Sequence, residues 1–244
     1  MSGNFSDAVI DMSDLHQHVL WGLDDGADSP EMMHAMLKTA HAQKIRRIAA
    51  TPHACPGFRP FDIALYNERI SEAQAFCDRN DMDITLMSGA EIMWTYNTVS
   101  ALRRNLVPTL NDTDCVLIEL WEDISWDEVR SAIKSVLHAG YMPIIAHVER
   151  YWSFTLHPKR AIALRSEFPV AYQVNASAVL SPATFIQRLF INRMLKEQAF
   201  DVLASDAHNC EGRRIRLGNA FSLVAERYGS EYAQYLVNFD GVVR

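Results

Sequence analysis

Short apolar runs alternate with longer amphipathic stretches along the whole chain. The runs cover residues 8–15, 45–50, 84–87, 115–120, 142–146, 170–174 and 200–204. Several of them are almost continuous in Val, Ile, Leu and Ala, which is typical of parallel strands covered on both faces. The pattern therefore predicts seven β-strands.

The stretches between the runs carry the signals of helix ends. Residues 28–31 read Asp-Ser-Pro-Glu, a cap followed by proline at an early helical position. Residues 125–128 read Ser-Trp-Asp-Glu, which has the spacing of a capping box, and Gly140 is placed to end that helix. Ser-Pro at 181–182 predicts the start of a helix that continues over residues 184–199.

Strands that alternate with helices imply βαβ units with right-handed crossovers. Seven units in 244 residues suit a closed or nearly closed barrel, slightly smaller than the usual eightfold form. An open doubly wound sheet is the alternative. We expect one domain over residues 1–244, in which residues 1–9 form a leader that can be flexible.

Composition narrows the class of protein. Apolar residues make up 49% and charged residues 22%, as in ordinary globular proteins. The net charge of −7 gives no basic footprint for nucleic acid. No apolar run approaches the ~18 residues of a membrane span, the N-terminus lacks a signal-peptide pattern, and the four cysteines form no CxxC pair. We therefore expect a cytoplasmic protein without nucleic-acid partners or membrane insertion; its oligomeric state is left open.

Acidic and imidazole side chains follow six of the seven runs. His16 and His18 end the first run, and their spacing of two directs both side chains to the same side of an extended strand. Because the carboxyl ends of parallel strands meet at one mouth of a barrel, catalytic groups collect there. The candidate ligands are His16, His18, Asp25, His53, Glu91, Glu119, His147, Asp206 and His208.

These nitrogen and oxygen ligands include no thiolate. Such a set favours Mn²⁺, Fe²⁺ or Zn²⁺, with Co²⁺ as a further candidate. The ligands are too many for one ion, so we predict two to three divalent ions that share a bridging carboxylate.

Other polar residues near these ligands are expected to support the structure. Asp24 is predicted to shape the turn before Gly26, Asp14 to orient one imidazole of the first pair, and Glu149 to form a salt bridge. Four further histidines have no matching partners and are read as packing or surface residues: His34, His41, His138 and His157.

Two arginines indicate a phosphate-containing substrate. Arg150 follows His147 by three residues and Arg213 follows His208 by five, so both leave the same rim as the ligands. Arginine binds tetrahedral oxyanions bidentately, which suits the oxygens of a phosphomonoester. Arg214 and Arg216 are expected to form surface ion pairs instead.

The ordered motifs resemble those of the polymerase-and-histidinol-phosphatase (PHP) superfamily. More narrowly, they resemble the bacterial metal-dependent protein-tyrosine phosphatases found with capsule and exopolysaccharide export systems. The resemblance covers about residues 10–230. Its motifs are Asp-Leu-His-Gln-His at 14–18, Asp-Asp-Gly at 24–26, Gly-Ala-Glu-Ile at 89–92, Pro-Thr-Leu-Asn at 108–111, Ile-Ala-His-Val-Glu-Arg-Tyr at 145–151, Gln-Val-Asn at 173–175 and Ala-Ser-Asp-Ala-His-Asn at 204–209.

The resemblance implies a distorted (β/α)₇ TIM-like barrel with a trinuclear centre, commonly occupied by Mn²⁺. By motif, the first ion would take His16, His18, Glu91 and Asp206. The second would share Glu91 and add Glu119 and His147, and the third would use Asp25, His53 and His208.

The resemblance also implies a substrate and a reaction. Arg150 and Arg213 fall where the family binds phosphate, and the family substrate is a bacterial tyrosine autokinase that controls polysaccharide assembly. A metal-activated hydroxide would attack phosphorus, and His208 or a metal-bound water would protonate the leaving group if needed. The chain departs from the pattern after His53 and after Arg213, which affects the rim that meets the substrate.

Three other functions compete with this interpretation. Cys210 and Arg216 have the C-x5-R spacing of cysteine-dependent phosphatases. A PHP-type phosphatase could act on a small molecule such as a sugar phosphate or histidinol phosphate. A non-catalytic metal-binding docking protein is the alternative from another class, although no ligand has been lost.

Overall fold

All seven apolar runs contain strands in the computed structural model, which describes residues 11–242. These strands are β1 (Met12–Gln17), β2 (Ile45–Ala50), β4 (Thr85–Met87), β6 (Cys115–Glu119), β7 (Met142–Ile145), β8 (Ala171–Asn175) and β9 (Val202–Ala204). Two short strands were not predicted, β3 (His53–Ala54) and β5 (Glu91–Met93). The expected leader over residues 1–9, and the start of the first run, lie outside the described residues.

The strands are parallel but do not form one continuous hydrogen-bonded sheet. One sheet has the order β1-β2-β4 and the other the order β3-β5-β6-β7-β8-β9. The chain passes from β2 in the first sheet to β3 in the second after a short break, and from β4 to β5 in the same way. The second sheet therefore continues the first. A parallel bridge between Gln17 and Ala207 joins the end of β1 to the segment after β9. The predicted parallel α/β architecture is confirmed.

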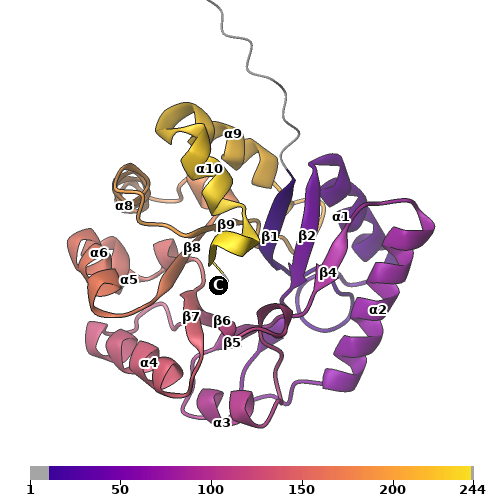
Figure 1. The fold of residues 1–244 in the computed structure, drawn as a ribbon, viewed down its shortest axis with the longest axis horizontal. Coiled ribbons are helices and arrows are strands. Elements are labelled where there is room, and N and C mark those ends of the chain that lie inside the picture. Colours follow the sequence, from indigo (N-terminus) through magenta and orange to yellow (C-terminus); the bar gives the residue numbers. More distant parts are fainter. Residues whose placement is uncertain (1–10, 243–244) are drawn as a thin grey trace, which may run out of the picture.

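Helices surround the strands (Figure 1). The longer ones are α1 (Pro30–Ala42), α2 (Ile63–Arg79), α4 (Trp126–His138), α6 (Pro158–Glu167), α8 (Phe185–Lys196) and α9 (Leu217–Tyr228). The shorter ones are α3 (Thr98–Arg103), α5 (Trp152–Thr155), α7 (Ala176–Leu180), α10 (Ser230–Leu236) and α11 (Phe239–Val242), with 3₁₀ turns η1 (Leu110–Asp112) and η2 (Val148–Arg150). Among residues 11–242, no helix combines the length and apolar character needed to cross a bilayer.

The predicted helix starts are correct in two of three cases. Ser29 caps α1 by accepting a hydrogen bond from the Met32 N–H, and Ser125 and Glu128 form the predicted capping box of α4. The start at Ser181 is wrong, because Ser181 ends α7 and α8 begins at Phe185. The Thr184 side chain accepts from the Gln187 N–H there and provides the actual cap.

One apolar cluster draws side chains from both sheets. It contains Leu15 of β1, Leu117 of β6, Ile144 of β7 and Val202 of β9, and Phe239 of α11 joins it. The helix α10 packs beside β9 (Figure 1). The polar residues described next lie at the carboxyl ends of the same strands.

Candidate metal centre

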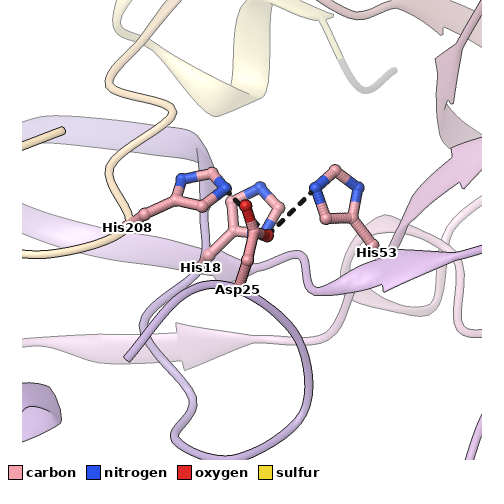
Figure 2. A group of neighbouring side chains, drawn as sticks. All are labelled: His18, Asp25, His53 and His208. Carbon is pink, nitrogen blue, oxygen red and sulfur yellow. Dashed lines mark ion pairs between the residues drawn. The ribbon is translucent and has the colours of Figure 1, made fainter. Parts of the chain in front are cut away.

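The nine predicted ligands come together near the carboxyl ends of the strands, where His53 and Glu91 open the short strands β3 and β5 just after β2 and β4. Three overlapping groups have ligand atoms close enough to hold an ion: His16, His18 and Glu91; His53, Glu91 and Glu119; and His18, Asp25, His53 and His208. Figure 2 shows the third group, in which His53 and His208 face the Asp25 carboxylate. His147 and Asp206 adjoin the first two groups, so the convergence predicted from strand order is present in the structure.

Glu91 lies at the middle of the site. Its Oε2 is 3.1 Å from His16 Nε2, 3.2 Å from His18 Nε2 and 3.0 Å from His53 Nδ1. Its Oε1 is 2.6 Å from His147 Nε2. The carboxylate is buried, and no hydrogen bond of good geometry reaches Oε2 from any described residue. Glu91 therefore has the position expected of a bridging ligand.

Two further candidate ligands, Asp206 and Glu119, lie near the histidines that contact Glu91. Asp206 Oδ1 is 3.6 Å from both His16 Nε2 and His18 Nε2. Glu119 Oε1 is 3.7 Å from His147 Nε2. The first two predicted ligand sets are thus brought together. The third set is joined by His18, which the sequence had placed only with the first ion.

Two of the candidate ligands have a backbone conformation that is uncommon outside glycine. The φ angle is 29° at His147 and 51° at Asp206. Such angles cost of order 1–3 kcal/mol each and persist where the surrounding structure enforces them, often at functional sites. Each residue lies two positions after the end of a strand, β7 or β9, so the turn there sets the direction of its side chain.

Asp24 has the predicted role in the turn and an additional one. Its Oδ1 accepts a hydrogen bond from the Gly26 N–H at 2.9 Å, and a Cβ on Gly26 would come within 2.3 Å of the His18 carbonyl oxygen. Its Oδ2 lies 2.6 Å from His18 Nδ1 and accepts from the His53 N–H at 2.8 Å. Asp24 therefore fixes the ring of His18 so that Nε2 faces Glu91.

Gln173 has the role that the sequence assigned to Asp14. The Asp14 carboxylate accepts from the Ser205 N–H at 2.9 Å and makes no hydrogen bond to an imidazole. Gln173 Oε1 instead lies 3.2 Å from His16 Nδ1 and accepts from the His147 N–H at 2.7 Å. The prediction for Asp14 is therefore wrong. Gln173 carried two sequence signals: its position near the end of a predicted strand and its place in the Gln-Val-Asn motif at 173–175.

The neighbours of His147 also differ from expectation. The Tyr151 hydroxyl lies 3.2 Å from His147 Nδ1 and accepts from the Leu120 N–H, so it orients this ring. Glu149 forms no ion pair with any described residue, which makes the predicted salt bridge wrong. It is buried, accepts from the Asn175 N–H at 3.3 Å, and has a pKa raised by burial.

Both predicted phosphate-binding arginines lie at the mouth of the site. Arg150 Nη2 is 2.5 Å from Asp206 Oδ2, and Arg213 Nη2 is 3.0 Å from Asp206 Oδ1. Arg213 Nη1 also lies 3.3 Å from Asp25 Oδ2. Both side chains are about one-third exposed, so an anion can reach them.

The remaining sequence predictions concern residues outside the site. Arg214 and Arg216 form no ion pair within the described part of the chain, so their predicted surface pairs are wrong. His34, His41, His138 and His157 belong to none of the ligand groups found among residues 11–242. His34 stacks on Phe76, with ring centroids 3.7 Å apart.

Burial and close charges shift several pKa values at the site. Burial alone would lower the pKa of His18, but the carboxylates of Asp24 and Glu91 outweigh it and raise this pKa to about 10. Burial would raise the pKa of Asp206, but His16 and Arg150 hold it well below its usual range. Without metal, positive charge on the histidines therefore compensates negative charge on the carboxylates.

The metal-free protein is expected to lose stability as pH rises from about 6.5 to about 10. The pKa of His18 is raised from 6.5 to about 10. Because this pKa is higher in the folded protein than in the unfolded chain, protonation of His18 stabilises the folded state. The stabilisation is complete below pH 6.5 and is lost as pH rises through about 10. An ion bound at the same nitrogen replaces the proton, so metal-loaded protein should not show this loss. Urea denaturation across this pH range, with and without chelator, measures the free energy of unfolding of the metal-free and the metal-loaded protein. The same pH dependence of this free energy in both samples would contradict the prediction.

Fold and site together define the class of protein. It is an α/β protein with candidate metal ligands clustered near the carboxyl ends of its parallel strands, an arrangement found in metal-dependent hydrolases. A family model described as capsular polysaccharide synthesis, CpsB/CapC, matches residues 12–241. The chain therefore belongs to the CpsB/CapC family, which confirms the family resemblance noted from its motifs.

Curated relatives match the chain over nearly its full length. The tyrosine-protein phosphatase CpsB of Streptococcus pneumoniae is 29% identical over 230 residues, covering 92% of this chain and 94% of the relative. The tyrosine-protein phosphatase YwqE of Bacillus subtilis is 28% identical over 220 residues, covering 90% and 86%. The family model, over residues 12–241, spans every candidate ligand.

Solved structures show the same fold. One, described as YwqE from Bacillus subtilis and CpsB from Streptococcus pneumoniae, unique metal-dependent tyrosine phosphatases, has a TM-score of 0.84 at 27% identity, covering 92% of this chain and 91% of that chain. A histidinol phosphate phosphatase from Lactococcus lactis has a TM-score of 0.60 at 17% identity, covering 90% and 94%. The second match bears on the fold alone.

Proposed function

We propose that this protein is a metal-dependent protein-tyrosine phosphatase. The observation that carries the proposal is the buried Glu91 carboxylate, which lies within 3.2 Å of nitrogens from His16, His18, His53 and His147. Arg150 and Arg213 lie beside this cluster and can bind an anion. The names of the curated relatives support the same activity.

We assign the ligands to three ions as the motifs imply. His16, His18, Glu91 and Asp206 would hold the first, Glu91, Glu119 and His147 the second, and Asp25, His53 and His208 the third. Two observations support the fit: Glu91 Oε2 and His208 Nε2 are buried without hydrogen-bond partners among the described residues, and His16 Nε2 lies only 3.2 Å from His18 Nε2. We propose Mn²⁺, which the family resemblance implies; the nitrogen and oxygen donors also suit Fe²⁺, Zn²⁺ or Co²⁺.

The protein's own groups have distinct roles in hydrolysis. Bound divalent ions would polarise phosphoryl oxygens and acidify water at the site. Arg150 and Arg213 would bind the equatorial phosphoryl oxygens and compensate their charge in the transition state. We assign His208 to the third ion because its Nε2 lies 3.4 Å from Asp25 Oδ1 and close to ligand atoms of His18 and His53. In the metal-free protein, burial and the charge of His18 lower the pKa of His208 to about 4. A phenolate of pKa ~10 can leave with little help.

We also propose that the strands form a distorted (β/α)₇ barrel. Treating β2 with β3, and β4 with β5, as interrupted single strands reduces the nine strands of residues 11–242 to seven. The Gln17–Ala207 bridge then links the last strand to the first. This arrangement supports the barrel over an open doubly wound sheet.

We propose a bacterial tyrosine kinase of a capsular polysaccharide system as the substrate, which the family description supports. The alternative is a small phosphate ester. Metal-loaded protein should hydrolyse a phosphotyrosine peptide with a higher kcat/KM than sugar phosphates or histidinol phosphate. Preference for a metabolite would favour the alternative, and no turnover of any substrate would favour a docking protein.

Replacing Cys210 with serine is expected to leave phosphatase activity unchanged. A cysteine nucleophile needs a lowered thiol pKa, whereas burial and the neighbouring Glu211 raise the pKa of Cys210. Turnover by the Cys210→Ser variant, and its loss on chelation, would exclude the C-x5-R mechanism. Metal-independent activity that vanishes in this variant would support that mechanism instead.

A further inference from the structure

Three neighbouring cavities form a groove that begins at the candidate metal centre. The first is lined by His53 and shares Arg59 and Phe61 with the second. The second shares Phe58 and Asn97 with the third. The third is the largest, with a volume of about 540 Å³. A chain segment bound at the metal centre could therefore continue along the protein surface.

The third cavity combines aromatic rings with carboxylates. Phe58 is 76% exposed, Trp121 is 51% exposed and Tyr96 is fully exposed. Neither lysine nor arginine lines it. We call it the aromatic–acidic pocket and define it by Phe58, Trp94, Tyr96, Trp121, Asp123 and Glu128. Exposed aromatic side chains gathered beside a cleft are typical of binding surfaces.

The pocket walls continue directly from the candidate ligands. Phe58 follows His53 after β3, and Trp121 follows Glu119 after β6. Trp94 directly follows β5, which begins at Glu91, and β5 pairs with both β3 and β6. Three adjacent strands therefore each supply a ligand and then an aromatic residue of the pocket.

Hydrogen bonds and close packing hold the three segments of the pocket together. The Thr95 hydroxyl donates to the Pro56 carbonyl at 2.8 Å. Gly57 has a φ of 87°, and a Cβ there would come within 2.1 Å of Asn97 Nδ2. The Trp94 N–H donates to the Glu119 carbonyl at 2.8 Å. The exposed rings are therefore carried on backbone segments fixed to one another, which lowers the entropy cost of binding.

We propose that the aromatic–acidic pocket binds a lysine or arginine side chain of the protein substrate, close in sequence to the phosphotyrosine. This inference rests on the proposed function. Aromatic faces attract cations, and the carboxylates of Asp123 and Glu128 complement the same charge. Asp123 is exposed and has no ion-pair partner in residues 11–242, so its charge is available to a ligand.

Peptides with a single phosphotyrosine test the proposal. One lysine is placed in turn at each position within about five residues on either side, which covers about 17 Å of extended chain. Norleucine and glutamate replace it in matched peptides. For at least one position we expect kcat/KM to be about three- to tenfold higher with lysine than with norleucine, and lowest with glutamate. Equal values for lysine and norleucine at every position would overturn the proposal.

Variants locate the effect in the pocket. The lysine-to-norleucine ratio should fall to about one in Asp123→Asn and in Trp121→Leu. It should be kept in Phe185→Ala, because Phe185 is 69% exposed but lies outside the groove. A preference that persists in both pocket variants would overturn the assignment. Wild-type turnover of a small aryl phosphate separates the two hypotheses: if it is absent the proposed function fails, and if it is present without a lysine preference only this inference fails.

Discussion

Replacing Glu91 with glutamine is expected to lower kcat toward a phosphotyrosine peptide about a thousandfold or more. Both carboxylate oxygens face imidazole nitrogens, with Oε1 2.6 Å from His147 and Oε2 within 3.2 Å of three other histidines. An amide keeps the size of the side chain but removes its charge and half of its acceptor capacity. Two of the proposed ions would therefore lose a shared ligand.

Glu91→Gln should lower the number of metal ions bound per chain as well as the rate. Glu122→Gln is the matched control, because Glu122 is exposed on the same rim and belongs to none of the ligand groups. Circular dichroism should show that both variants are folded. A folded Glu91→Gln variant with wild-type metal content and a rate within a few-fold of wild type would contradict the bridging role.

Replacing Arg150 with methionine is expected to lower kcat/KM about 10²- to 10³-fold, the usual loss when one transition-state donor is removed. Arg150 lies at the mouth of the site, where its guanidinium group contacts Asp206. Methionine keeps much of the apolar stem but supplies no charge and no donor for phosphoryl oxygens. The loss should therefore concern the reaction more than the fold.

Arg214→Met provides the comparison, since Arg214 is exposed and contacts none of the candidate ligands through an ion pair in the described structure. Its kcat/KM should remain within about twofold of wild type, as for most surface substitutions. Metal content should be measured for both variants. A similar kcat/KM for both would show that Arg150 does not bind the reacting phosphate.

The apolar pattern predicted the fold well because each buried strand is a short run of its own. The two extra strands could not be predicted, since His53–Ala54 is too short for a period to show and Glu91–Met93 contains the ligand itself. The error at Ser181 has a local cause. Ser-Pro is a frequent helix start, but Thr184 provides the hydrogen bond that caps α8.

The candidate ligands could be predicted because a parallel topology brings the carboxyl ends of the strands together whatever the exact strand register and turn geometry. The residues that orient them could not. Gln173 and Tyr151 are neutral and carry no metal-ligand signature, and their contacts to His16 and His147 depend on strand register and turn geometry. The positive φ at Asp206 and the sharing of His18 between two groups likewise arise only in the folded chain.

Elemental analysis of the purified protein, combined with phosphotyrosine-peptide turnover before and after chelation, tests the central claim most directly. We expect about two to three divalent ions per chain, loss of turnover when they are removed and recovery when Mn²⁺ is restored. Undiminished turnover by protein shown to contain no metal would contradict the proposed metal centre.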